Sequence, residues 1–208
     1  SSGNILYSCS DDKTIKKWDL RAKSPVATHQ HTFEVTTICA LSEDAVFFGG
    51  LDNQIYCWDS ELAHIDYEIS NQMRPNSHSE MIYSTALSPT KRYMLSVSAD
   101  KSMKVWNVQP FLSKSLEQQG RCMAQFYSQF NSSDFDIFRA SWSCDEKYVS
   151  CGGAKLLFIW NFQNKKLEYA LPGHLGNVTC VDFSPNDPSV VLSAGTDGII
   201  FVGELENN

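Results

Sequence analysis

The sequence predicts an all-β protein in which one sheet unit repeats along the chain. The first observation is a recurring strand end, an apolar or mixed run that closes on Trp followed by Asp or Asn. The second observation is an acidic turn residue at a fixed distance before that Trp. Short β-rich runs bounded by turn residues fill the remainder, and 112–125 is the one stretch with any helical pattern. The four clear strand ends are 15–19, 55–59, 103–107 and 157–161.

The recurring strand ends define a period. A fifth segment, 200–204, keeps the frame but carries Gly203 where the others carry Trp. Successive marked positions are 40, 48, 54 and 43 residues apart, close to the roughly 40–45 residues of a propeller blade once insertions lengthen two steps. The marked positions are Trp18, Trp58, Trp106, Trp160 and Gly203.

The acidic and histidine positions keep the same register. Asp stands six residues before the marked position in every repeat except the fourth, which has Ala154 there. In three repeats a His precedes the acid by 21 to 23 residues. These pairs are His31 with Asp52, His78 with Asp100, and His174 with Asp197; Asp12 precedes Trp18 without a matching His.

This pattern resembles the WD40-repeat family, which implies a β-propeller with blades of four antiparallel strands. In that family a loop His meets the turn Asp, with a Ser or Thr and the strand Trp nearby. Because buried polar groups must be paired, such a clamp specifies one strand arrangement. The resemblance implies the clamps His31–Asp52–Trp58 and His78–Asp100–Trp106, an incomplete pair His174–Asp197, and a partial set Asp12–Trp18.

We expect a single domain of about four and a half blades, the C-terminal fragment of a seven-blade ring of roughly 300 residues. The fourth repeat has neither His nor Asp at the expected places, so packing must hold it, with Trp142 as a main contributor. The expected division is a partial blade 1–30, blades 31–70, 74–125 and 126–172, and a last blade 173–208 that lacks its closing strand.

Composition and motifs argue against other functional classes. A net charge of −7 disfavours broad nucleic-acid binding, although Lys13, Lys16, Lys17, Arg21 and Lys23 form either a local basic patch or a solvated strand face. No apolar run reaches the roughly 18–20 residues of a membrane span. Seven cysteines without C-x-x-C spacing indicate buried free thiols of an intracellular protein.

No catalytic, metal or cofactor motif is present, and we expect no small-molecule substrate. A His near an Asp and a Ser invites comparison with a catalytic triad. It recurs three times in one register, however, and no nucleophile elbow accompanies it. A structural clamp explains the residues, and we expect no enzyme.

The C-terminal half resembles the WD-repeat subunits of the U5 small nuclear ribonucleoprotein. The resemblance rests on 106–111, 139–143, 169–174 and the Gly-Glu ending at 201–205, while Asn107, Gln109 and Ala154 and the insertion 112–138 depart from it. It implies a nuclear splicing scaffold that contacts other subunits, including the large core protein of the spliceosome. Any contact with RNA would be indirect, and no membrane is involved.

Two sets of residues are candidates for partner binding. Loop residues flank the clamps on one rim: Phe33, Glu34, Leu51, Ser79, Glu80, Ala99, Asn177 and Thr196. Aromatic residues crowd the insertion, a composition that interfaces favour. The alternative is that they pack against a neighbouring blade. They are Phe126, Tyr127, Phe130 and Phe135.

A second function remains open at this point. The W-D-x-R box at 18–21 matches the segment through which many WD40 proteins dock to the adaptor of a cullin-type ubiquitin ligase. Arg21 would supply a bidentate charge contact there. An Arg that ends such a strand for structural reasons is the competing interpretation.

Overall fold

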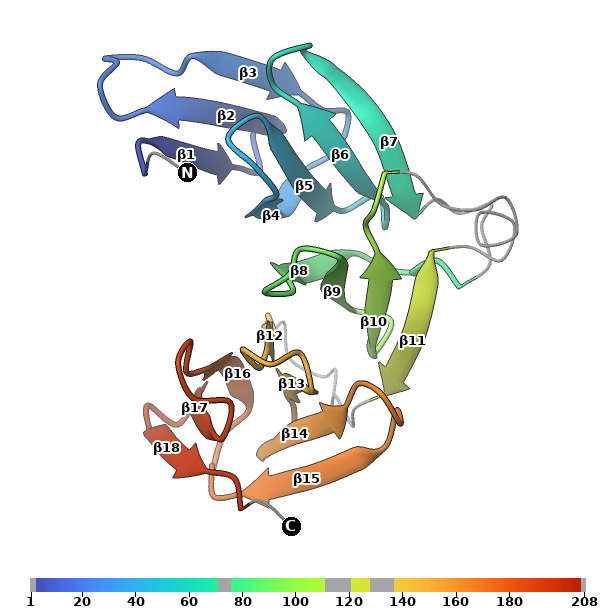
Figure 1. Cartoon of the computed structure of the whole chain (residues 1–208), viewed down its shortest axis with the longest axis vertical. Coiled ribbons are helices and arrows are strands. Elements are labelled where there is room, and N and C mark those ends of the chain that lie inside the picture. Colours follow the sequence, from blue (N-terminus) through green and yellow to red (C-terminus); the bar gives the residue numbers. More distant parts are fainter. Residues whose placement is uncertain (1–2, 71–75, 111–120, 128–136, 207–208) are drawn as a thin grey trace.

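The computed structural model describes residues 3–70, 76–110, 121–127 and 137–206, and every regular element in these ranges is a β-strand. The strands form five antiparallel sheets that fan in an arc around a common centre (Figure 1). This confirms the all-β prediction. No helix within the described ranges is long and apolar enough to cross a bilayer.

Each sheet is a meander in which consecutive strands pair. The first sheet holds β1 (Ile5–Cys9), β2 (Thr14–Asp19) and β3 (Ala27–Gln30). The second holds β4 (Val35–Ala40), β5 (Ala45–Gly50), β6 (Ile55–Asp59) and β7 (His64–Ser70). The third holds β8 (Ile82–Leu87), β9 (Tyr93–Ser98), β10 (Ser102–Asn107) and β11 (Cys122–Tyr127).

The remaining two sheets complete the arc. The fourth holds β12 (Ala140–Trp142), β13 (Tyr148–Gly152), β14 (Leu156–Asn161) and β15 (Leu167–Pro172). The fifth holds β16 (Val178–Phe183), β17 (Val190–Gly195) and β18 (Ile200–Glu204). The first strands β4, β8, β12 and β16 contact one another in turn and so lie at the centre.

The two three-stranded sheets lack different strands of the repeating unit. Trp18 pairs with Leu6 just as Trp58 pairs with Val46, so β1–β3 correspond to β5–β7. Gly203 pairs with Val191 in the same way, so β16–β18 correspond to β4–β6. Among the described residues, the first sheet therefore lacks an innermost strand and the fifth lacks an outermost one.

The turn before each strand with a marked position contains one residue of positive φ in all five sheets. The residue five positions before the marked position has a positive φ, which favours glycine and asparagine over residues with larger side chains. These residues are Lys13 (70°), Asn53 (65°), Lys101 (67°), Lys155 (60°) and Gly198 (76°). In four of the five sheets the residue directly before the positive-φ residue is the Asp of the repeat, and in the fourth sheet it is Ala154.

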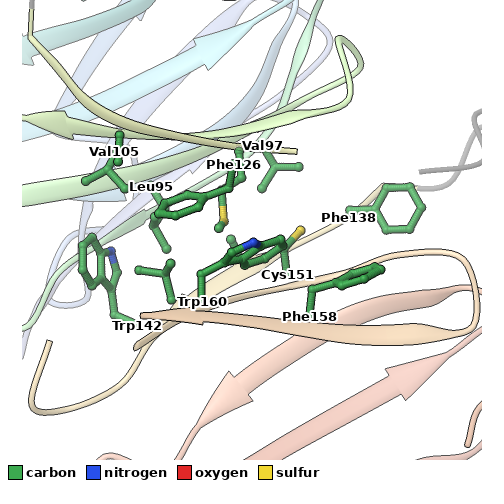
Figure 2. Close-up of a cluster of buried hydrophobic side chains, with 13 residues drawn as sticks. Leu95, Val97, Val105, Phe126, Phe138, Trp142, Cys151, Phe158 and Trp160 are labelled. Carbon is green, nitrogen blue, oxygen red and sulfur yellow. The ribbon is translucent and has the colours of Figure 1, made fainter. Parts of the chain in front are cut away.

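Apolar side chains fill the space between neighbouring sheets. Figure 2 shows the cluster between the third and fourth sheets, where Phe126 on β11 and Trp160 on β14 meet with ring centroids 5.4 Å apart. Phe126 and Phe138 are 3% and 4% exposed. The expectation that Phe126 contacts a partner is therefore wrong, because its ring belongs to this core.

The strand β11 also revises two expectations for this region. It runs to Tyr127, two residues beyond the expected blade limit at 125. It makes 122–125 extended rather than helical, whereas 111–120 lie outside the described residues.

Polar contacts tie neighbouring sheets together. Lys91 Nζ donates to the Leu41 carbonyl at 2.6 Å, between the third and second sheets. Thr90 Oγ1 donates to Glu146 at 2.6 Å, between the third and fourth sheets. Ser141 Oγ donates to Asp182 at 2.7 Å, between the fourth and fifth sheets. Each bond fixes the angle between two adjacent sheets.

Gly152 provides a test of how closely the fourth and fifth sheets pack. A Cβ at Gly152 would lie 1.8 Å from the carbonyl oxygen of Val178 on β16. We expect Gly152→Ala to lower the free energy of unfolding by at least about 2 kcal/mol, because backbone atoms must move apart. Urea unfolding followed by tryptophan fluorescence measures this.

The control is Gly203→Ala, since a Cβ there meets no atom within 4 Å. This change should alter the stability by less than about 0.5 kcal/mol. Equal stability of the two variants would contradict the close approach of the sheets.

Candidate functional site

The third sheet contains a complete clamp. His78 Nδ1 lies 2.8 Å from Asp100 Oδ2, and His78 Nε2 lies 2.6 Å from Ser96 Oγ. Trp106 Nε1 donates to the same Ser96 Oγ at 2.7 Å. The bonds link the loop before β8, the strand β9, the β9–β10 turn and the strand β10. The clamp is therefore drawn from two neighbouring strands, the turn between them and the loop that opens the sheet.

The electrostatics of this clamp favour a neutral imidazole beside a carboxylate. Burial lowers the pKa of His78, and the neighbouring Asp100 opposes this only in part. Burial would raise the pKa of Asp100, but hydrogen bonds from His78, Ser102 and the Ser79 amide hold it far below its usual range. A Ser96 hydroxyl that donates to Nε2 then requires Nδ1–H to donate to Asp100.

In the second, third and fifth sheets, the residue two positions before the marked position lies against the His–Asp pair; these residues are Tyr56, Lys104 and Phe201. The sequence pattern did not identify this role. Lys104 is 3% exposed, and its Nζ donates to the Asn76 and Ser77 carbonyls at 2.8 Å each. The same Nζ is 3.9 Å from Asp100. Lys104 thereby fixes the backbone that carries His78.

The second sheet has a different clamp from the one expected. His31 Nε2 lies 3.1 Å from Asp52 Oδ2, and the Tyr56 hydroxyl donates to the same oxygen at 2.8 Å. Phe48 occupies the position that Ser96 has in the third sheet, opposite the residue two before the Trp. Trp58 Nε1 is buried and finds no acceptor among the described residues. Trp58 therefore packs beside this clamp without a hydrogen bond to it.

The fifth sheet keeps the His, Asp and Ser without the Trp. His174 Nδ1 lies 3.0 Å from Asp197 Oδ2, and Nε2 lies 3.0 Å from Ser193 Oγ. Phe201 presents its ring edge-on to His174 with centroids 4.7 Å apart. Burial raises the pKa of Asp197, but backbone amides, among them that of Leu175, and His174 outweigh this and lower it to about 2.

The first and fourth sheets complete the comparison. Trp18 Nε1 donates to Ser8 Oγ at 2.9 Å, and Asp12 accepts a bond from the Thr14 hydroxyl at 2.6 Å. In the fourth sheet Trp160 pairs with Val149, eleven residues earlier, against twelve in the other sheets. This shorter hairpin, together with Ala154, leaves no His–Asp–Ser set among the described residues of this sheet.

Packing replaces the clamp in the fourth sheet. Trp142 is 6% exposed, and its ring meets Phe162 edge-on with centroids 5.1 Å apart. Its Nε1 donates to the Ala86 carbonyl of the third sheet at 3.2 Å. The side chain thus stabilises the fourth sheet and its junction with the third.

The clamp serines were not assigned from the sequence, although a signal exists. Ser8, Ser96 and Ser193 each stand ten residues before the marked position of their repeat. Ser150 also stands ten residues before Trp160, but the shorter hairpin turns it away from this position. Spacing alone therefore needs the strand register before it can identify the serine.

The clamps support loops that carry the predicted rim residues. Three sheets repeat one backbone bond between the loop before the first strand and the turn after the second. These bonds are Leu51 N to Glu34 O (3.1 Å), Ala99 N to Met81 O (3.0 Å) and Thr196 N to Asn177 O (2.8 Å). Two of these bonds join expected rim residues directly, and the third fixes Ala99 to the residue after Glu80.

Two of the rim residues are exposed and apolar. Phe33 and Leu51 are 47% and 44% exposed, and Leu51 N donates to the carbonyl of Glu34, the residue after Phe33. The Glu34 side chain forms an ion pair with Lys13 at 3.7 Å. Ser79 N donates to Asp100 at 3.2 Å, so that loop is part of the third clamp. Glu80 contributes its carbonyl as acceptor for Ser98 Oγ at 2.9 Å.

The other partner candidates lie elsewhere. Tyr127 is 70% exposed at the end of β11, whereas Phe130 and Phe135 fall outside the described residues. Arg21 lies in the β2–β3 loop, where its guanidinium donates to both Asp19 carboxylate oxygens, at 2.9 and 2.6 Å.

A cavity of about 940 Å³ lies at the centre of the arc, lined by residues of the first strands and their flanking turns. Its lining includes Thr37, Ser141, Cys9 and Cys180. Among the described residues, no three His, Cys, Asp or Glu side chains group as metal ligands.

Trp58 and Trp106 differ in the hydrogen bonding of their indole nitrogens, which allows a matched test of the clamp. Trp58 and Trp106 are each 1% exposed, but only Trp106 has a hydrogen-bond acceptor for its indole N–H within the described residues. We expect Trp106→Phe to destabilise the protein by about 1 kcal/mol more than Trp58→Phe, because it also breaks a buried hydrogen bond. Urea unfolding of both variants measures the difference. A larger loss for Trp58→Phe would show that the second clamp uses its indole nitrogen.

His29 predicts a pH dependence. Burial lowers its pKa, helped by the nearby His31, and its Nε2 has no hydrogen-bond partner among the described residues. Just below pH 6.5 the unfolded chain binds a proton at His29, whereas the folded protein keeps this imidazole neutral. The free energy of unfolding therefore decreases as the pH falls through about 6.5. The stability difference between pH 7.5 and 5.5 should shrink in His29→Phe, by a fraction of the ~1.4 kcal/mol that one pKa unit represents. His64→Phe, at an exposed position, is the control, and an equal effect there would refute the assignment.

Comparison with known proteins agrees with this geometry. The model of the family "WD domain, G-beta repeat" matches residues 1–19, 23–59, 70–107 and 165–202. The longest unmatched stretch, 108–164, contains β11 and three of the four strands of the sheet without a clamp, β12, β13 and β14.

Individual relatives extend over almost the whole chain. The U5 small nuclear ribonucleoprotein 40 kDa protein of Dictyostelium discoideum is 33% identical over 208 residues, covering 97% of this chain and 54% of the relative. Pre-mRNA-splicing factor cwf17 of Schizosaccharomyces pombe is 31% identical over 203 residues, covering 97% and 56%. DDB1- and CUL4-associated factor 13 of Xenopus tropicalis is 24% identical over 158 residues, covering 76% and 32%. The chain spans about half the length of the splicing relatives, and it belongs to the WD40-repeat family.

Proposed function

We propose that this chain is part of a non-catalytic protein–protein interaction scaffold of the U5 small nuclear ribonucleoprotein, acting in the nucleus in pre-mRNA splicing. The observation that supports this most is the likeness to the U5 40 kDa proteins and cwf17 along 97% of the chain. The same proposal treats the five sheets as blades, with limits near those expected from the repeats. Its partners are other U5 subunits, including the large core protein, and any contact with RNA is indirect.

The rim supports a binding role through rigidity. Loops that are pinned by buried clamps lose little conformational entropy when a partner docks on them. Phe33 and Leu51, which we call the rim pair, combine exposed apolar area with such a fixed backbone. A partner that buries the rim pair gains hydrophobic free energy without having to order the loop.

The burial of the clamps argues against hydrolytic chemistry by their serines. A catalytic serine must meet its substrate. Ser96 is 0% exposed and Ser193 is 5% exposed, and each hydroxyl is already bonded to a histidine. These His–Asp–Ser sets are therefore better suited to holding strands together than to attacking a substrate.

The ubiquitin-ligase alternative receives less support. Arg21 already has a bidentate partner in Asp19 of its own box, which accounts for the residue without a second protein. The likeness to the CUL4-associated factor is lower and covers less of the chain than the likeness to the splicing proteins. The variant Arg21→Ala distinguishes the ligase function from the splicing scaffold.

The test uses the complete gene product with an affinity tag, recovered from nuclear extract. We expect U5 RNA and the large core protein to co-purify, and the ligase adaptor to be absent. Phe33→Ala combined with Leu51→Ala should reduce the recovery of the core protein. Leu62→Ala, at a 68% exposed position in the β6–β7 turn, should not.

The outcomes distinguish the hypotheses. Recovery of the core protein that is insensitive to Arg21→Ala supports the splicing scaffold. Recovery of the ligase adaptor alone, lost in Arg21→Ala, would replace it with the ligase function. If the rim-pair and Leu62 variants behave alike while U5 RNA is still recovered, the scaffold stands but binds through another surface.

A further inference from the structure

Three Ser-Pro dipeptides occur in the chain, and two of them share a structural role. Ser88-Pro89 and Ser184-Pro185 each follow the first strand of a sheet, β8 and β16. Ser88 is 2% exposed, and its Oγ accepts the Tyr93 amide at 3.3 Å. Ser184 Oγ accepts the amides of Asn186 and Asp187, each at 3.3 Å. Both serines serve to close a turn.

Ser24-Pro25 lies outside this register. It falls in the loop between β2 and β3, residues 20–26, where 20–24 are all exposed. The corresponding connections in the second and fourth sheets are shorter, 60–63 and 162–166. Within the described part of the chain, Ser24 Oγ has no hydrogen bond, so folding does not account for this Ser-Pro.

The loop around Ser24 is basic in a protein with a net charge of −7. Arg21 and Lys23 are exposed on either side of Ala22, and Arg21 has Asp19 as its ion-pair partner at 2.6 Å. Lys17 Nζ, at the end of the same strand pair, is held by Asp44 at 2.5 Å. A dianion introduced at position 24 would therefore meet two exposed cations, Arg21 and Lys23, and would compete with Asp19 and the nearby Glu43 for Arg21.

We propose that Ser24 is a phosphorylation site for a proline-directed serine/threonine kinase, and that Arg21 receives the phosphate. The Ser24 hydroxyl oxygen attacks the γ-phosphorus of a magnesium-bound nucleoside triphosphate. The bond from that phosphorus to its bridging oxygen breaks, the nucleoside diphosphate leaves, and the hydroxyl proton passes to the base of the kinase. Pro25 restricts Ser24 to the extended conformations in which such kinases read their substrates.

The modification changes which ion pair the loop makes. A phosphoserine carries a charge of about −1.5 to −2 at pH 7 and offers three acceptor oxygens in a geometry that suits a guanidinium. Arg21 then exchanges Asp19 for the phosphate, and the loop 20–26 changes from net positive to near neutral. The phosphate thus removes the exposed positive charge of this loop while the sheets stay as they are.

The first experiment compares the three Ser-Pro sites in one sample. The complete gene product is incubated with a cyclin-dependent kinase and magnesium ATP, and phosphate is located by mass spectrometry over time. In the folded protein we expect Ser24 to be modified at least about tenfold faster than Ser88 and Ser184, since those two require local unfolding. Synthetic peptides of the three sites should react at comparable rates. Ser24→Ala and Pro25→Ala should each abolish the fast phase.

The second experiment tests the acceptor. The phosphorus NMR titration of phosphorylated protein should give a lower phosphate pKa in the wild type than in Arg21→Ala, with Lys23→Ala closer to the wild type. No phosphate at Ser24, or equal rates at all three sites in the folded protein, would overturn the site. An equal phosphate pKa in the wild type and in Arg21→Ala would overturn the role of Arg21. Neither result depends on whether U5 RNA co-purifies with the protein.

Discussion

The buried contact between an imidazole and a carboxylate is the interaction on which the rest of this structure depends. A turn Asp and a loop His are far apart in sequence, and each would be costly to bury alone. Joined at 2.8 Å in the third sheet, they satisfy one another and fix the loop before β8 against the β9–β10 turn. The positive-φ turn that follows each acid presents its carboxylate in the same way from sheet to sheet. In the three sheets that keep the pair, the position of the loop and of its rim residues follows from that arrangement.

Much of this could be predicted from the sequence, because the information is carried by spacing. Residues that recur six and 27 to 29 positions before the marked position must occupy equivalent places in a repeated sheet, so the His–Asp pairs and the all-β fold could be predicted. The details of each clamp could not be. In the second sheet Phe48 replaces the serine, and Tyr56 supplies a hydroxyl to Asp52 instead. Only the cross-strand register shows that these residues face each other.

The errors have the same origin. Phe126 looked like an interface residue because it stands in an aromatic-rich insertion, yet β11 extends far enough to place its ring in the core. The fourth hairpin is one residue shorter than the others, and counting residues back from Trp160 does not show this. Pattern reasoning locates equivalent positions only where the turns have equal length. Where a hairpin changes length, three-dimensional pairing is needed to identify which residue faces which.

Because each clamp is assembled within one sheet, the repeats are free to diverge separately. The third sheet retains all four polar partners. The second has Tyr56 in place of the serine hydroxyl and no hydrogen bond from its indole within the described residues, the fifth has lost the indole, and the fourth dispenses with the set. A substitution that weakens one sheet leaves the hydrogen bonds of its neighbours in place, so selection acts on units smaller than the domain. Such modularity allows one repeat to lose its clamp and carry a long insertion nearby while the other sheets keep their own hydrogen bonds.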